Sequence, residues 1–320
     1  MMNAHTQKSI SPFHEGEQKA QTRAGTRERS EMIGQRAIRT FMPDQHRGFF
    51  GQLPFVVLGS VDPDGWPWAS IVSGQPGFAT SPTPTSLEIN AQPVQHDPLG
   101  TSLITGAPIG VLGIEPATRR RNRMNAKIAG VASDRIVLEV QQSFGNCPQY
   151  IQTHDLRFVR APNTPIELRS YTFGTLDDAA HTLISIANTF YVSSYVTAES
   201  DTVTEGVDVS HRGGQPGFVS VAGNTLTIPD YAGNNFFNTI GNFIANPKAG
   251  LLFTDNTTGD VLMLTGRVEL LWGDHPEVQA IPSAERAWRF TLDHGVRIYN
   301  ALPFRAELTE GSSYSHKIDA

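Results

Sequence analysis

The sequence predicts a mainly β protein with flanking helices, built as two copies of one small barrel domain. The chain has 320 residues, which is enough for about two domains. Its 29 glycines and 21 prolines make up about 16% of the residues and indicate many turns between short strands. The tetrapeptide Gln-Pro-Gly-Phe occurs twice, at 75–78 and 215–218, an offset of 140 residues (215 − 75).

The same offset continues downstream of the repeated tetrapeptide without a gap. The matching segments are Gly110-Val111-Leu112 with Gly250-Leu251-Leu252, Thr118 with Thr258, and Lys127-Ile128 with Arg267-Val268. The offset stays constant, and apolar segments of one copy align with apolar segments of the other, which indicates a duplicated domain. Each copy then holds two helices and about six short antiparallel strands, and closing those strands into a barrel removes their exposed edges.

The first copy is expected to begin with two short helices. Ile33, Ala37 and Phe41 recur at helical spacing, which predicts a helix over 30–42 that ends before Pro43. A second helix is expected over 44–50, capped by Asp44. The β-rich run 55–61, four turn residues and the run 66–73 predict a hairpin. Further strands are expected at 86–90, 108–114, 124–131 and 135–142.

Residues 160–168 carry two prolines and are expected to link the copies. The second copy begins with a helix that Thr175 can cap. Its strands are expected at 190–197, 203–209, 217–221, 225–228, 249–254 and 260–271, and its other helices at 234–246 and 283–294. The resulting domains are a flexible N-terminal arm over 1–28, a first barrel over 29–160, a second barrel over 170–305 and a loose tail over 306–320.

Charge and composition argue against several classes of protein. The formal net charge is −6, which argues against a nucleic-acid binder. The one cysteine, Cys147, cannot form an internal disulfide or a cysteine-rich zinc site, and the ten histidines show no metal-binding spacing. No run of about 18 apolar residues is present, so no membrane partner is expected. We therefore expect a cytoplasmic protein without a metal site.

Polar residues gather in two segments where the second copy differs most from the first. One is the glycine-rich insertion 208–214, and the other is the turn and helix over 228–247. A helix start presents free N–H groups and a positive dipole end that suit a phosphate, and arginines can add charge-assisted bonds. The candidate residues are Ser210, His211, Arg212, Gly213, Gln215, Asn234, Asn235, Asn238, Thr239 and Arg267. The alternative is that these residues only form caps and turns.

The segments 207–253 and 262–270 resemble the pyridoxamine 5′-phosphate oxidase-like family of FMN-binding split barrels. The runs TRRRNRMN (118–125) and QSFGNCPQYIQ (142–152) are similar to its two-barrel subfamily, and the resemblance covers roughly 13–305. It implies two tandem split β-barrels that form an intramolecular pseudo-dimer, with one flavin site organised by the second barrel and walled by the first. The implied cofactor is FMN, with FAD or a deazaflavin as less favoured alternatives.

The resemblance further implies an oxidoreductase that transfers hydride or electrons between a nicotinamide or other donor and a small molecule. A redox partner protein and a homodimer are also implied. The sequence departs from the true oxidases in two places. Asn234 and Asn235 stand near the position of a phosphate-binding basic residue, and no C-terminal Arg-His substrate clamp is found at a matching place. Pyridoxamine phosphate is therefore not the expected substrate.

Three alternatives stay open at this point. The protein can be a flavin- or tetrapyrrole-binding carrier or sensor without turnover. The arginines at 119, 120, 121 and 123 can form a solvated strand edge, a docking patch for an anionic substrate, cofactor or electron donor, or a nucleic-acid contact. The loop 143–150 around Cys147 can be purely structural or can form a wall of the flavin pocket.

Overall fold

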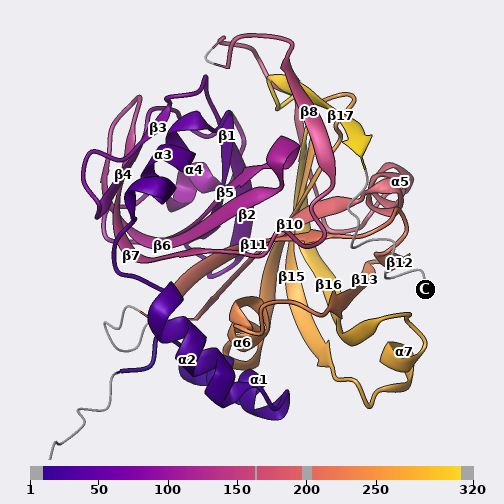
Figure 1. The fold of residues 1–320 in the computed structure, drawn as a ribbon. Helices are drawn as coiled ribbons and strands as arrows, with labels where there is room; N and C mark the ends of the chain where they lie inside the picture. The colour runs from indigo at the N-terminus through magenta and orange to yellow at the C-terminus, as the bar shows by residue number, and fades with distance from the viewer. Residues whose placement is uncertain (1–9, 163, 197–203, 311–320) are drawn as a thin grey trace, which may run out of the picture.

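The computed structural model describes residues 10–162, 164–196 and 204–310. Within these residues the strands form a seven-stranded sheet, an eight-stranded sheet and a two-stranded ribbon. In Figure 1 the two large sheets make neighbouring lobes, with the first half of the chain in indigo and magenta and the second half in orange and yellow. The expected mainly β class with flanking helices is confirmed.

The first sheet has the strand order β2-β1-β5-β6-β7-β4-β3. Its strands are β1 (Phe55–Val61), β2 (Pro67–Ser73), β3 (Ala79–Thr80), β4 (Ser86–Ile89), β5 (Pro108–Glu115), β6 (Arg120–Val131) and β7 (Ile136–Gly145). The helices of this half are α2 (Arg27–Ala37), α3 (Asp44–Gln52) and α4 (Leu99–Ser102). The predicted hairpin is confirmed as β1 and β2, and the carboxylate of Asp62 closes its turn by accepting from the N–H groups of Asp64 and Trp66.

The second sheet has the order β11-β10-β14-β15-β16-β13-β12, with β9 added beside β16. Its strands are β9 (Ser170–Phe173), β10 (Thr189–Val196), β11 (Gly206–Gly213), β12 (Ser220–Ala222), β13 (Thr225–Tyr231), β14 (Lys248–Thr254), β15 (Val261–Leu271) and β16 (Ala284–Ile298). The helices are α5 (Asp178–Ile186), α6 (Asn238–Ala245) and α7 (Pro276–Gln279). The seven-strand path has the same order of successive strands as the first sheet, which is consistent with a split-barrel-like fold.

Each sheet encloses its own apolar core, and a third core lies between the sheets. The crossing of the two halves depends on two glycines that the 140-residue offset makes equivalent. A Cβ on Gly110 in β5 would lie 2.7 Å from the carbonyl oxygen of Val207, and one on Gly250 in β14 would lie 2.3 Å from that of Pro67. Each half therefore needs a residue without a side chain where an edge strand of the other half crosses it.

The N-terminal segment differs from the flexible arm expected over 1–28. Residues Glu15–Arg23 form helix α1, whose start is capped by the ring of His14. The helix packs directly on α6, because a Cβ on Gly16 would lie 2.2 Å from the carbonyl oxygen of Gly241, and Figure 1 shows the two helices side by side. Composition could not predict this order, since it comes from a contact with a distant part of the chain. Residues 1–9 lie outside the described residues.

The helix expected over 283–294 is wrong, because this segment belongs to strand β16. Trp288, Phe290 and Leu292 are buried, and the residues between them are more exposed. This alternation has the two-residue period of a strand. β16 pairs with β15 on one side and with β13 and β9 on the other. The start of α5 also differs, because Asp177 caps it in place of Thr175.

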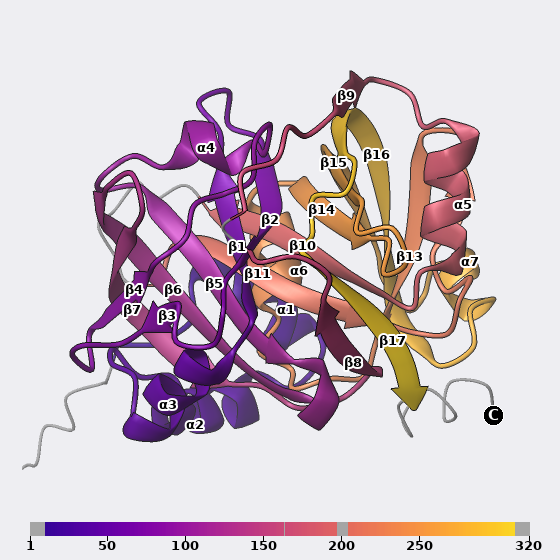
Figure 2. The same ribbon diagram turned by 90° about the horizontal axis from the view of Figure 1, so that it is seen from above.

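The end of the second half also extends beyond its expected boundary at residue 305. Strand β17 (Phe304–Glu310) pairs with β8 (Thr153–Phe158), a strand from the end of the first half. Figure 2 shows this ribbon crossing beside the two sheets. The loose tail expected over 306–320 is thus a strand as far as Glu310, and the rest of it lies outside the described residues.

Candidate functional site

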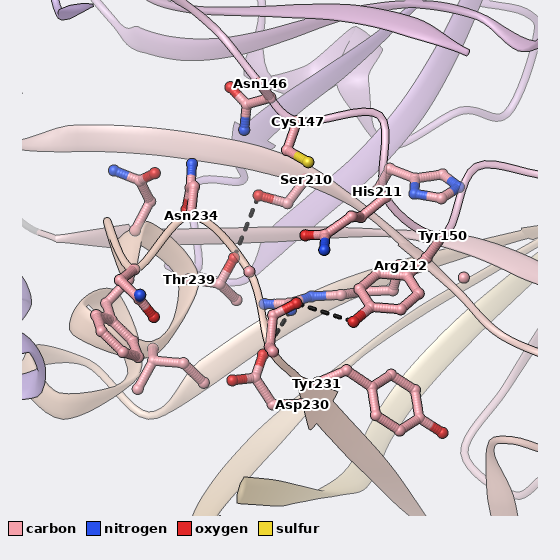
Figure 3. Close-up of a pocket in the computed structure, with 18 of the residues that line it drawn as sticks. Asn146, Cys147, Tyr150, Ser210, His211, Arg212, Asp230, Tyr231, Asn234 and Thr239 are labelled. Atoms are coloured by element: carbon pink, nitrogen blue, oxygen red, sulfur yellow. Dashed lines mark hydrogen bonds and ion pairs between the residues drawn. The ribbon is translucent and has the colours of Figure 1, made fainter. Parts of the chain in front are cut away.

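A polar pocket with a cavity volume of about 110 Å³ opens between the two halves. The first half contributes β6 and the loop 146–150, and the second contributes β11, the end of β13 and the start of α6. Figure 3 shows side chains from both halves converging there, with Asn146 and Cys147 facing Ser210, His211 and Arg212. The loop around Cys147 therefore forms a wall of this pocket.

Strand β6 divides its arginines between two faces, as alternation along a strand requires. Arg120 lies over the ring of Phe49 on one face, 4.8 Å from the ring centroid. Arg121 and Arg123 point the other way and line the pocket. These two side chains therefore do not belong to a fully solvated strand edge.

The pocket arginines differ in how their charge is balanced. Arg123 forms a buried ion pair with Asp208, at 2.5 Å, and donates to Asn238. Arg212 and Arg286 both pair with Asp230, at 2.6 Å and 2.9 Å. Among the described residues no carboxylate pairs with Arg121, whose guanidinium instead lies 3.4 Å from Nδ1 of His211.

Burial and the neighbouring Arg123 lower the pKa of Arg121 to about 10, so the side chain stays charged at neutral pH. The pocket also holds buried polar atoms that lack a hydrogen-bond partner in the part of the chain that the structure describes. These are Nε of Arg121, Arg123 and Arg212 and Oδ1 of Asn146. Buried polar atoms in proteins are nearly always paired, so water or a ligand in the pocket has to pair with this set.

His211 is buried beside these cations and is neutral. Burial is the largest cause that lowers its pKa well below the ordinary value, and Arg121, Arg212 and His154 lower it further. A guanidinium can only donate, so Nδ1 of His211 accepts from Arg121 and the proton sits on Nε2. Nε2 faces the hydroxyl of Thr189 at 3.4 Å.

The lowered pKa of His211 predicts a loss of stability in mild acid. The unfolded chain takes up a proton at this residue near pH 6.5, whereas the folded chain resists it, so the free energy of unfolding falls as pH drops below about 6.5. We expect His211→Asn to lose less stability than wild type between pH 7 and pH 5.5. Urea unfolding at both pH values measures this, and equal losses in the two proteins would contradict the assignment.

The structure brings most of the candidate residues from the sequence into this one pocket. Those that line it are Ser210, His211, Arg212, Gly213, Asn234, Asn235, Asn238 and Thr239. Gln215 does not line it, and its carbonyl closes the turn to the N–H of Phe218. Arg267 lies outside it as well, exposed on β15 with its guanidinium 5.5 Å from the ring centroid of Trp66.

The start of α6 is less available to a phosphate than the sequence suggests. Phe237, in the left-handed region at φ 63°, precedes the helix without a side-chain cap. The side chain of Asn238 is held between Arg123 and Glu17 of α1, and Thr239 donates to the hydroxyl of Ser210 at 3.2 Å. The guanidinium groups of Arg121 and Arg123 from β6 line the pocket instead, and of these two only Arg123 has a carboxylate partner among the described residues.

Two tyrosines that the sequence did not single out line the same pocket. The rings of Tyr150 and Tyr231 lie 5.5 Å apart, tilted by 40°, and the Tyr150 hydroxyl donates to the carbonyl of Ala232 (Figure 3). Burial raises the pKa of Tyr150 to about 12, so the hydroxyl stays protonated. The lining of the pocket thus combines arginine side chains with flat aromatic surface.

Among the comparisons with known proteins, the one with solved structures gives matches. No family model matches the chain, and no curated protein matches it. A variant of HupZ from Group A Streptococcus is similar at 12% identity, over 38% of this chain and 98% of its own, with a TM-score of 0.30. A protein of the pyridoxinephosphate oxidase family from Clostridium acetobutylicum is similar at 14% identity, over 41% of this chain and 92% of its own, with a TM-score of 0.27.

The structure of MrkH from K. pneumonia with c-di-GMP is similar at 10% identity, over 80% of this chain and 87% of its own, with a TM-score of 0.23. Scores this low carry no argument about function, which has to come from the pocket itself. In the described part of the chain, none of the helices has the length and apolar character to cross a membrane.

Proposed function

We propose that the chain is a flavoprotein that binds FMN in the pocket between its two halves, with the phosphate beside Arg121. The observation that carries the proposal is the charge of Arg121, which is buried in the pocket wall without a carboxylate partner among the described residues. A buried, unpaired cation is costly for a protein unless an anion pairs with it. A phosphate matches a guanidinium in both charge and hydrogen-bonding geometry.

The rest of the pocket fits a flat ring joined to that phosphate. Tyr150 and Tyr231 offer aromatic faces, and the unpaired Oδ1 of Asn146 can accept from a ring N–H. The likeness of residues 207–253 to FMN-binding split barrels favours FMN over other phosphorylated ring compounds. When bound, FMN supplies the hydride or electron transfer, and the side chains here hold and orient it.

We further propose that the two halves form an intramolecular pseudo-dimer of split barrels. The matching strand orders and the paired glycine crossings at Gly110 and Gly250 support this arrangement. A pseudo-dimer has a second position equivalent to the FMN pocket. The strand register locates this position. Leu112 and Leu252 are equivalent by the 140-residue offset, and Leu112 pairs with Arg123 whereas Leu252 pairs with Met263.

The equivalent position has lost the features that suit a phosphate. Met263 stands in place of Arg123 and Val261 in place of Arg121. The cavity left there is about 10 Å³, roughly the space of one water molecule. Asp97 lines it as well, and its carboxylate accepts from Ser70, the residue equivalent to Ser210. Above its pKa, which burial raises to about 6, this carboxylate would repel an anion.

One FMN per chain is therefore expected, although the fold is duplicated. Titration of the flavin-free protein with FMN, followed by the flavin absorbance near ~450 nm, gives the stoichiometry. Saturation at two flavins per chain would contradict the closed second position. A protein that is colourless as purified and cannot be reconstituted with FMN would contradict the proposal as a whole.

For the reaction we propose hydride or electron transfer between a nicotinamide or other donor and a small molecule, by a homodimer or with a redox partner protein. Anaerobic addition of NADH or NADPH to the FMN-loaded protein tests this directly. Bleaching of the flavin absorbance supports an enzyme, and an unchanged spectrum supports a flavin carrier or sensor. Mass spectrometry of the molecule that co-purifies separates a flavin from a tetrapyrrole.

A further inference from the structure

A second cavity of about 200 Å³ lies on the other side of His211 from the FMN pocket. Residues of strands β8 and β17 and of the end of helix α5 line it. It exceeds the ~150 Å³ of an engineered apolar cavity that binds benzene, so it has space for a substituted aromatic ring. None of the site residues proposed from the sequence points to this cavity except His211.

Strand register places this cavity on the axis that relates the two halves. Phe55 of β1 pairs with Ser73, and Thr189 of β10 pairs with Gly213. Ser73 and Gly213 are equivalent by the 140-residue offset, so Phe55 and Thr189 are equivalent as well. Three pairs of equivalent residues line the cavity in this way. They are Phe55 with Thr189, Ile71 with His211, and Ile114 with Thr254.

In each of these pairs the first half contributes an apolar side chain and the second half a polar one. At these pairs, apolar side chains of the first half lie opposite polar side chains of the second half, here called the polar wall, and Leu302 and Phe304 add apolar surface to the lining. A ligand that fits the cavity has a mainly apolar body with polar atoms on the side of the polar wall, since unpaired polar atoms against hydrocarbon would cost free energy.

The hydrogen bonds on the polar wall are offered by neutral donors. Tyr191 is buried, at 6% exposure, and its hydroxyl has no hydrogen-bond partner among the described residues. Nε2 of His211 carries a proton because Arg121 occupies Nδ1, and its contact with Thr189 is long, at 3.4 Å. Two such donors on one wall suit an acceptor oxygen.

Charged ligands are disfavoured by the rest of the lining. No lysine or arginine is among the described residues that line the cavity. The carboxylate of Asp255 lies at this cavity but accepts from the N–H groups of Thr257 and Thr258 in its own turn. The burial that lowers the pKa of His154 keeps that ring neutral.

We propose that this cavity binds an uncharged, mainly apolar molecule through a carbonyl oxygen, which accepts from Tyr191 and His211. The assignment of this molecule as the substrate rests on the proposed flavin function, because His211 borders both cavities and places the carbonyl beside the FMN pocket. The binding itself needs no flavin.

Calorimetric titration of the flavin-free protein with acetophenone tests the binding. Ethylbenzene keeps the ring and the two-carbon side chain but lacks the carbonyl oxygen, and 4-acetylbenzoate adds a charge. We expect acetophenone to bind about fivefold more tightly than ethylbenzene, the worth of roughly one hydrogen bond, and 4-acetylbenzoate to bind more weakly than acetophenone. Equal affinities for acetophenone and ethylbenzene, or no saturable binding of acetophenone, would overturn the proposal.

Two variants locate the site. Tyr191→Phe keeps the ring and removes the hydroxyl, so it should reduce the preference for acetophenone and leave ethylbenzene binding unchanged. Ala306→Phe fills the cavity from β17 and should abolish binding of both, whereas Ile166→Phe, outside the cavity, should not. Acetophenone binding that survives Ala306→Phe in a protein with an unchanged melting temperature would overturn the proposed location.

Parallel titrations with FMN separate this proposal from the flavin function. Neither Tyr191 nor Ala306 lines the FMN pocket, so FMN affinity should be unchanged in both variants. Binding of acetophenone without binding of FMN would leave this cavity as a ligand site and remove its role as a substrate site. Binding of FMN without binding of acetophenone would remove the carbonyl site alone.

Discussion

Arg121→Gln should weaken FMN binding by about 100-fold without lowering the stability of the flavin-free protein. A charge-assisted hydrogen bond to a phosphate contributes about 1.5–3 kcal/mol, and about 1.4 kcal/mol changes a dissociation constant tenfold. In the flavin-free protein the same guanidinium is buried without a carboxylate partner among the described residues, so replacing it should be neutral or stabilising. Quenching of flavin fluorescence gives the affinity, and thermal unfolding gives the stability.

Arg120→Gln is the matched control for this experiment. Arg120 precedes Arg121 in the same strand but lies over Phe49 on the opposite face. Its replacement should change FMN affinity by less than about twofold, because an exposed charge at this position is screened by solvent. A clear loss of stability in flavin-free Arg121→Gln would assign that arginine a structural role and contradict the account.

Asp208→Asn should destabilise the folded protein by about 3–5 kcal/mol. One oxygen of this buried carboxylate accepts from Arg123 and Asn125 and the other from Asn242, which ties β6 of the first half to β11 and α6 of the second. Loss of the carboxylate leaves Arg123 as a buried cation without its counter-ion, and breaking one partner of a buried pair has this order of cost. Urea unfolding measures the change.

Glu269→Gln provides the contrast, because it removes an exposed ion pair with Arg289 and should leave the unfolding midpoint nearly unchanged.

Glu17, packed near Asp208, partly offsets the loss of stability in Asp208→Asn. Burial and the charge of Asp208 raise the pKa of Glu17 well above its usual value, and a neutral residue at 208 removes that repulsion. A loss below about 1 kcal/mol in Asp208→Asn would show that the pair does not join the two halves.

Local sequence signals were enough where an element is defined by its own residues. The hairpin of β1 and β2 follows from alternating β-rich runs around the turn that Asp62 closes. Helix α1 has a local signal in the capping box of His14 and Glu17, but its polar composition hid it, and the helix packs through a contact between Gly16 and Gly241, which lie far apart in the sequence. Strand β16 was missed because the spacing of Ala284, Ala287 and Trp288 is that of a helix, whereas in the strand Ala287 and Trp288 lie on opposite faces and are both buried.

The site residues also divide into those that the sequence could identify and those that depend on contacts between distant segments. Residues 210–213 and 234–239 could be predicted because the two copies differ there, and the structure places most of them around one pocket. Arg121 could not be distinguished from Arg120, since the face that becomes buried depends on how the second half packs on β6. Arg267 was chosen for its charge alone, and its register in β15, opposite Lys248, puts it on the outer surface.

A comparison of FMN with riboflavin tests whether a flavin phosphate pairs with Arg121. Riboflavin has the same ring and ribityl chain but no phosphate. Titration of wild-type protein and Arg121→Gln with both flavins is expected to give a wild-type preference for FMN of about 100-fold that nearly disappears in the variant. Equal affinities of the wild-type protein for FMN and riboflavin, or a preference for FMN that survives in Arg121→Gln, would contradict the account.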